Sequence, residues 1–155
     1  MFANTLARGR KSKGFTLVEL MAVVLIASIL LSIAVPLYMQ QVRKGRRVDA
    51  KTAVMDLAGR EERMFSTTNA YSIDPTQLGY AAVGSGAAFP QTVGNGYYQI
   101  TVAVPALAPT TFVITAKAIS ADQLKDTNCF SFSVTQTGQQ SALNSGGVDS
   151  TASCW

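Results

Sequence analysis

The sequence contains no histidine and only two cysteines, Cys129 and Cys154. Without histidine, neither a Ser-His-Asp triad nor a Cys-His pair can be built, and a zinc site would lack the ligands that usually fill its four positions. Charged residues are also scarce, at 14% of the chain. These absences argue against an enzyme, and they predict no catalytic residues, no metal site and no cofactor.

Both cysteines lie in the last 27 residues of a chain whose N-terminus resembles an export signal. This placement favours one disulfide between Cys129 and Cys154, formed in an oxidising compartment. Closing a loop of this size stabilises a fold by about 3.5 kcal/mol in the chain-entropy description. A pair of reactive free thiols is the alternative.

The charges are unevenly distributed along the chain. Four of the 13 basic residues lie before residue 14, and the nine others are balanced by nine acidic residues. Beyond Ser66, only Lys117 and Lys125 face four aspartates. Because non-specific binding to nucleic acid needs several cations on one surface, we predict that this protein does not bind nucleic acid.

Residues 1–14 contain no acid and carry four cations, which is typical of a cytoplasmic targeting segment. The run from Leu20 to Met39 then has 20 residues without a charge. As a helix it would span about 30 Å, the hydrocarbon thickness of a bilayer. Four further cations follow at 43, 44, 46 and 47, so the positive-inside rule leaves the orientation open. The expected disulfide places the C-terminal part outside the cytoplasm.

The apolar run also allows a competing interpretation. The small residues Ser32 and Ala34 have the spacing of an ordinary secretory cleavage site, which would release a soluble domain beginning at Val35. Glu19 argues against this interpretation, because a carboxylate at the start of an apolar segment raises the insertion cost by up to about 3 kcal/mol. Such an acid is either functional or simply hydrated at the headgroups.

The segment from Lys13 to Leu20, Lys-Gly-Phe-Thr-Leu-Val-Glu-Leu, resembles the class III signal of type IV prepilins. The resemblance implies cleavage between Gly14 and Phe15 by a prepilin peptidase that also methylates the new N-terminus at Phe15. It implies that Glu19 pairs with the N-terminal amine of a neighbouring subunit. Both charges are costly in an apolar bundle when alone, so their pairing would set the register of assembly.

Further features fit the same family. The Gly45-Arg46-Arg47 segment, the strand at Cys129 and the Cys-Trp ending look most like the PilE-type minor pilins. Pro36 matches a proline common in pilin helices, and it predicts a kink or a locally melted turn near residues 32–36.

The expected fold class is α+β, in which a long N-terminal helix packs against an antiparallel sheet, as in type IV pilins. After the leader 1–14, we expect a membrane-spanning assembly helix over 15–39. An amphipathic spine helix would follow over 40–66, with apolar residues at spacings of three and four. Turn signals predict an αβ-loop over 67–96, held by Tyr71, Leu78, Tyr80 and Phe89. Three alternating strands and a disulfide-bounded C-terminal loop then fill 97–155.

The sequence therefore predicts a structural subunit of a type IV pilus, namely a minor pilin, that supports pilus biogenesis, adhesion or twitching motility. Its expected partners are other pilin subunits, the prepilin peptidase and inner-membrane assembly proteins. The precursor would sit in the bacterial inner membrane with its head in the periplasm, and the mature subunit in the extracellular pilus. A pseudopilin of a secretion or competence system is the alternative, and a secreted domain cleaved after Ala34 is a weaker one.

Overall fold

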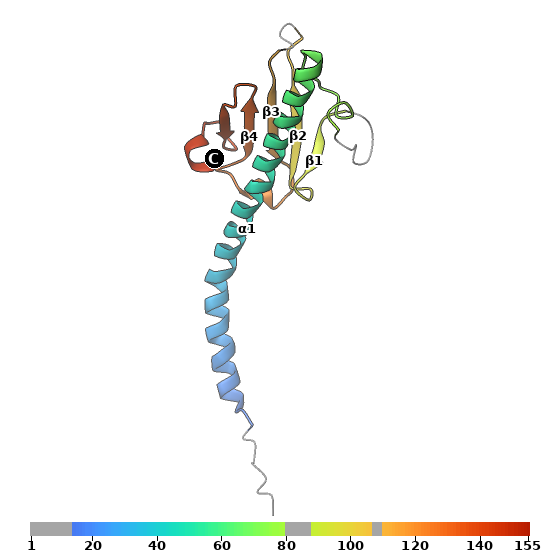
Figure 1. The fold of residues 1–155 in the computed structure, drawn as a ribbon. Helices are drawn as coiled ribbons and strands as arrows, with labels where there is room; N and C mark the ends of the chain where they lie inside the picture. Colours follow the sequence, from blue (N-terminus) through green and yellow to red (C-terminus); the bar gives the residue numbers. More distant parts are fainter. Residues whose placement is uncertain (1–13, 80–87, 107–109) are drawn as a thin grey trace, which may run out of the picture. The chain divides into compact units, whose positions relative to one another are not determined.

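A computed structural model describes residues 14–79, 88–106 and 110–155. Its elements, shown in Figure 1, are α1 (Leu17–Thr68), β1 (Gln91–Val93), β2 (Tyr98–Ala103), β3 (Val113–Ala118), the 3₁₀ helix η1 (Gln123–Lys125), β4 (Ser131–Thr135), β5 (Gln140–Leu143) and α2 (Thr151–Cys154). The chain divides into two compact units, residues 1–38 and 39–155.

In the first unit, every described residue from 14 to 38 is exposed. The helix is formed through Pro36, so the locally melted turn that the sequence allowed is not present. Ser28 and Ser32 donate hydrogen bonds to the carbonyls of Leu25 and Ile29 at 2.8 and 2.7 Å. Such bonds let serine hydroxyls lie in an apolar helix without an unpaired donor.

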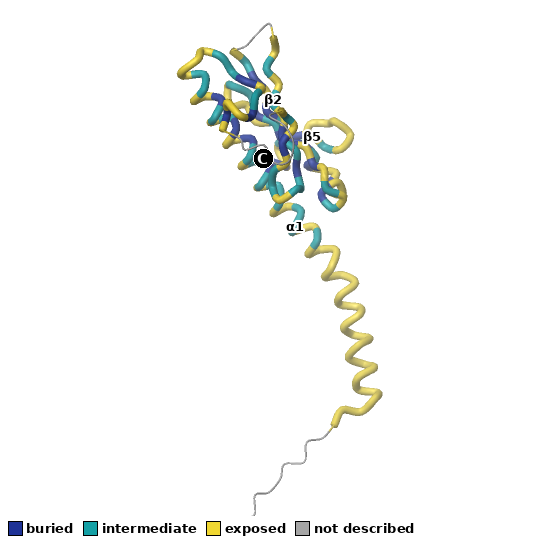
Figure 2. Tube along the Cα trace, turned by 90° about the vertical axis from the view of Figure 1, so that its right-hand side faces the viewer, coloured by how far each residue is buried: buried dark blue, intermediate teal, exposed yellow. Residues whose placement is uncertain are grey.

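In the second unit, the C-terminal part of α1 lies across one face of an antiparallel sheet (Figure 1). The strand order is β1-β2-β3-β4-β5, so each strand pairs with its neighbour in sequence. The buried residues Ala50, Val54 and Leu57 of α1 form the apolar stripe expected for a spine helix. They share one core with inward-facing residues of the sheet, including Ile100 and Ile114. Figure 2 shows that the buried parts of the chain belong to this second unit. The expected α+β architecture is confirmed.

The sheet has two more strands than the three predicted. Strand β1 lies inside the segment expected to be the αβ-loop, 67–96, and pairs with β2 through Gln91 opposite Ile100. Strand β5 lies in the polar segment expected to be an irregular tail, and pairs with β4 through Ala142 opposite Phe132. A three-residue strand and a strand with one buried residue give no period-two pattern of large apolar side chains, so the sequence concealed both.

The helix continues two residues beyond its expected end at 66 and stops at Thr68. Asn69 adopts a positive φ of 56°, and its N–H bonds the carbonyl of Phe65 at 2.8 Å. This left-handed residue ends the helix as glycine often does, and asparagine tolerates the conformation.

The segment after the helix is attached to the core by the aromatic and apolar side chains predicted from the sequence. Tyr71 stacks on Phe65 and meets Phe112 edge-on, each with a centroid distance of 4.7 Å. Leu78 is buried and Phe89 packs against the core. Tyr80, the fourth predicted contact, lies outside the described residues.

Candidate assembly site and basic groove

Helix α1 begins with a cap that the sequence analysis overlooked. The hydroxyl of Thr16 accepts a hydrogen bond from the N–H of Glu19 at 3.2 Å, and its carbonyl accepts one from the N–H of Leu20, also at 3.2 Å. Thr16 and Glu19 stand at the spacing of a capping box, in which the acid also faces the positive end of the helix. Glu19 therefore has a local reason to be present, besides the assembly role predicted for it.

Phe15 and Glu19 come together at the start of the first unit. With Leu20 and Val23 they line a shallow hollow of about 240 Å³. Phe15 is 83% exposed, and Gly14 and Phe15 precede the first helical residue, Leu17. The Gly14–Phe15 bond thus lies in irregular, exposed backbone, which is the form of chain that a peptidase can bind.

The rest of the first unit is an apolar helical surface without a cover. The large side chains from Leu17 to Leu37 are at least half exposed, and none of the apolar window is buried. This helix is long and apolar enough to cross a membrane.

The predicted disulfide is present between Cys129 and Cys154, whose Cα atoms are 5.6 Å apart. It joins the residues just before β4 to the short C-terminal helix α2. Trp155 meets Phe132 edge-on with a centroid distance of 5.9 Å, and its Nε1 donates to the carbonyl of Ser141 at 2.7 Å. The C-terminal segment is therefore held by the bridge, by aromatic packing and by a strand pairing.

Three ion pairs attach the spine helix to the connection between β3 and β4, formed by Arg43 and Arg46 with Asp122 and by Arg47 with Asp126. The guanidinium of Arg47 donates two hydrogen bonds, of 2.7 and 2.8 Å, to the carboxylate of Asp126, and both side chains are largely buried. Arg46 Nη1 lies 2.5 Å from Asp122 Oδ2, and this hydrogen bond holds the pKa of Asp122 below its ordinary value. In the sequence these cations appear only as a charge cluster, because no local pattern pairs residues 76 and 79 positions apart.

The side chain of Gln123 lies in the interior next to Asp126. It is fully buried, and its Nε2 donates to the hydroxyl of Tyr98 at 2.8 Å. Weaker contacts from the same nitrogen reach Asp126 and the carbonyl of Arg43. The amide thus fixes η1 against both the helix and the sheet.

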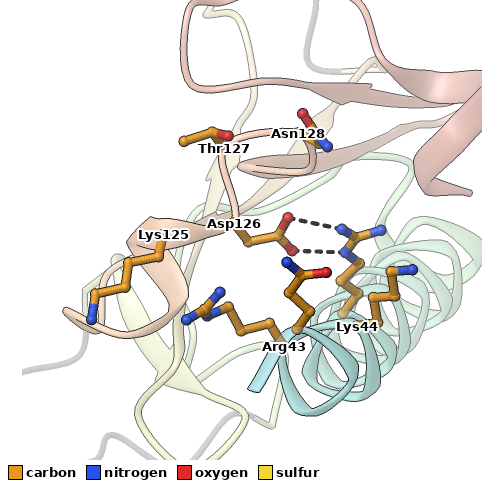
Figure 3. Close-up of a pocket in the computed structure, with 8 residues that line it drawn as sticks. Arg43, Lys44, Lys125, Asp126, Thr127 and Asn128 are labelled. Atoms are coloured by element: carbon orange, nitrogen blue, oxygen red, sulfur yellow. Dashed lines mark hydrogen bonds and ion pairs between the residues drawn. The ribbon is translucent and has the colours of Figure 1, made fainter. Parts of the chain in front are cut away.

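Beside the Arg47–Asp126 pair lies a polar groove of about 260 Å³, shown in Figure 3. Its walls come from about two turns of α1 and from the end of η1 with the residues that follow it. The lining residues are Gln40, Arg43, Lys44, Arg47, Lys125, Asp126, Thr127 and Asn128. Four of these side chains are cationic and one is anionic.

One acidic residue of α1 that the sequence did not single out lies in the core. Glu61 is fully buried, and its Oε2 accepts a hydrogen bond from the N–H of Ser72 at 3.0 Å. Burial raises the pKa of Glu61 to about 6. The only available signal was its position, since residue 61 continues the buried stripe of Ala50, Val54 and Leu57.

In the described ranges, no group of three or more histidine, cysteine or acidic residues could hold a metal ion. Gly14, Phe15 and Glu19 lie within one stretch of the first unit, whereas the disulfide and the basic groove belong to the second. The first unit is thus an exposed apolar helix that begins with a capping threonine and an acidic residue. In the second unit, ion pairs hold α1 to the connection between β3 and β4.

Comparison with known proteins gives two family matches. A family model described as "Type IV minor pilin ComP, DNA uptake sequence receptor" matches residues 36–133, and one described as "Prokaryotic N-terminal methylation motif" matches residues 9–35. The chain is 35% identical over 71 residues to the type IV major pilin protein PilA of Myxococcus xanthus. That match covers 46% of this chain and 32% of PilA, so the chain spans about a third of the length of this relative.

Among solved structures, a type IV pilin from Shewanella oneidensis is similar with a TM-score of 0.44 and 21% sequence identity. The match covers 63% of this chain and 89% of that pilin.

Proposed function

Since the chain belongs to the family of type IV minor pilins described as ComP, we propose that it is a minor structural subunit of a type IV pilus, polymerising through its N-terminal helix. The methylation motif at residues 9–35 and the family imply processing by a prepilin peptidase and assembly with other pilins. The observation that carries the proposal is the apolar segment of α1, which is exposed at every described residue up to 38 and carries one carboxylate.

The first step of the proposed function is processing. The peptidase would cut between Gly14 and Phe15 and methylate the new amine of Phe15. The exposed, non-helical backbone at these residues supports this site. Removing residues 1–14 also removes four of the chain's 13 cations, which leaves nine cations and nine acids. The mature subunit would therefore be nearly neutral.

The second step is lateral assembly. Glu19 would pair with the methylated amine of Phe15 in a neighbouring subunit, because each charge is costly alone among apolar helices and less costly when paired. Pro36 would introduce a bend by removing one backbone hydrogen bond within the helix. The disulfide supports an orientation in which the head of the membrane-anchored precursor lies in the periplasm.

The capping geometry of Thr16 and Glu19 requires an experiment that separates two roles of the acid. Glu19→Gln keeps a residue that suits a capping box but removes the charge. Thr16→Ala removes the capping hydroxyl and keeps the charge. If inter-subunit pairing is the role of Glu19, Glu19→Gln is cleaved normally but is lost from sheared filaments, whereas Thr16→Ala still assembles.

The opposite pattern, in which Glu19→Gln assembles and Thr16→Ala does not, would show that the acid serves only the helix start. The intact mass of the membrane-extracted protein provides a separate check on processing. It should equal residues 15–155 with one added methyl group and two hydrogens fewer. A species beginning at Val35 would support the secreted domain instead.

The pseudopilin alternative shares the same N-terminal helix, so it is distinguished by where the subunit is found. We expect the protein in sheared surface filaments, at low abundance relative to a major pilin. The ion pairs weigh against nucleic-acid binding as its function, because Arg46 and Arg47 are engaged by Asp122 and Asp126. The family description names a DNA uptake sequence receptor, and we do not propose that activity for this chain.

A further inference from the structure

The basic groove is lined by four cationic side chains but by only one carboxylate. Of its four cations, Arg47 is neutralised by Asp126. Arg43 lies 3.5 Å from Asp122, whose other oxygen is already held by Arg46 at 2.5 Å. The Nε of Arg43 also lies 3.5 Å from Asp122, so two arginines share this one carboxylate. The charge of Arg43, which lines the groove, is therefore only partly neutralised.

The two lysines of the groove are free of such partners. Lys44 and Lys125 are exposed, and in the described parts of the chain no carboxylate lies within 4.0 Å of either ammonium. They come from different elements, one from α1 and the other from the end of η1, so only the folded head brings them to one groove. In Figure 3 they lie on opposite sides of this groove. Thr127 and Asn128 add neutral hydrogen-bonding groups to the same wall.

The groove also has a distinctive place in the sequence. Its first residue, Gln40, is the first polar side chain after the apolar run that ends at Met39. Arg43 and Lys44 follow within one turn of the same helix, about 6 Å further along its axis. In a membrane-anchored precursor, the turn that leaves the hydrocarbon is the turn that meets lipid headgroups.

We propose that this groove binds the phosphate of an anionic lipid headgroup, with Lys44 and Lys125 as the principal charges and Arg43 as an additional donor. The inference rests on the membrane-anchored precursor of the proposed function. Basic side chains next to a membrane helix are attracted to anionic headgroups, and guanidinium and ammonium groups are the donors that phosphates accept.

A single headgroup fits this groove better than a nucleic acid does. A duplex is held by many cations that follow its backbone. Here four cations line one groove of about 260 Å³, and the head beyond residue 66 has only Lys117 and Lys125. The occupant would seat the head at the membrane surface before the subunit is extracted into a filament.

The test uses the full chain in neutral detergent micelles and native mass spectrometry. Phosphatidylglycerol, phosphatidylcholine and inorganic phosphate are titrated in parallel. We expect phosphatidylglycerol to bind about tenfold more tightly than phosphatidylcholine, and the double variant Lys44→Gln, Lys125→Gln to lose that preference. The variant Lys44→Arg, Lys125→Arg should keep it.

The matched control is Arg63→Gln, Lys117→Gln, which removes the same net charge from exposed positions outside the groove. This control should retain the preference for phosphatidylglycerol, and the thermal unfolding midpoint of each variant verifies its fold. Equal loss in control and groove variants, or no preference in the parent protein, would overturn the proposal.

Two further arms distinguish the source of the anion and the basis of the result. If inorganic phosphate competes as well as the lipid does, or if the groove variant loses binding to duplex DNA but not to phosphatidylglycerol, the lipid assignment is wrong. Glu19→Gln should keep the full lipid preference. Its behaviour in filaments can therefore fail the assembly proposal without affecting this one.

Discussion

The carboxylate of Glu61 accepts a hydrogen bond from the backbone N–H of Ser72, and this carboxylate is completely buried. Its second oxygen has no hydrogen-bond partner in the described structure. Burial raises the pKa of Glu61 from 4.5 to about 6, against the opposing effect of the Ser72 hydrogen bond. The contact joins α1 to the first residues of the connection that follows it.

This pKa shift predicts that the stability of the head falls as the pH rises. The folded-state pKa lies above the unfolded value, so the associated stability is fully present below about pH 4.5 and is lost through about pH 6. Glu61→Gln removes the titration. Between about pH 4.5 and 7, we expect the variant to gain about 2 kcal/mol relative to the parent protein, measured by urea unfolding.

Glu62→Gln is the companion variant, because Glu62 is exposed and bonds the hydroxyl of Tyr71 at 2.9 Å. It should keep most of the pH dependence, since burial is the main cause of the shift at Glu61 and Glu62 is a lesser one. A pH profile that Glu61→Gln leaves unchanged would show that another group is responsible.

The Arg47–Asp126 pair predicts a large stability loss when one partner is removed. Asp126→Ala leaves a largely buried guanidinium without its carboxylate, which costs about 3 to 5 kcal/mol in comparable sites. Asp56→Ala breaks the exposed pair with Arg60 on the same helix and should cost under about 1 kcal/mol. Equal losses in chemical unfolding would mean that the buried pair contributes no more than a surface pair.

The disulfide predicts a stability loss on reduction. The bridge spans 25 residues, and opening a loop of this size costs about 3.5 kcal/mol in the chain-entropy description. The paired variant Cys129→Ser, Cys154→Ser should behave like the reduced protein. Unfolding midpoints with and without dithiothreitol test this. Sensitivity to dithiothreitol in the paired variant would indicate an effect unrelated to the bridge.

Two glycines predict opposite responses to the same substitution. Gly94 has a φ of +60°, and an added Cβ would lie 2.9 Å from the Cβ of Asp49. Gly94→Ala should therefore destabilise the head by roughly 1 to 3 kcal/mol. Gly59 lies inside α1 with nothing within 4 Å, so Gly59→Ala should stabilise it by up to about 1 kcal/mol. A stabilising Gly94→Ala would contradict the close approach of that turn to the helix.

Periodicity made the helix and the three central strands predictable. The stripe of Ala50, Val54 and Leu57 and the alternating strand residues follow from which side chains must be buried. The short strands β1 and β5 lack that signal, because their order comes from hydrogen bonds to a neighbouring strand and little from burial. These two strands are defined only by their pairing with β2 and β4 in the folded sheet.

The candidate site likewise combines residues that could be predicted from the sequence with residues that could not. Gly14, Phe15 and Glu19 are close in sequence, so a local motif was enough to predict them. The groove and the ion pairs join α1 to residues near 125, and no local pattern specifies which arginine meets which aspartate. The Thr16 cap is local as well, and the spacing of three residues between Thr16 and Glu19 is the sequence signal for it.

The sequential strand order has a consequence for how the head folds. Each strand pairs with its chain neighbour, so the sheet can grow by closing short loops, and such local contacts form quickly. The contacts between Arg47 and Asp126 span 79 residues and close a much longer loop. We therefore expect the sheet to form first and the contact between Arg47 and Asp126 to form after the folding transition state, so that Asp126→Ala changes the refolding rate less than the unfolding rate.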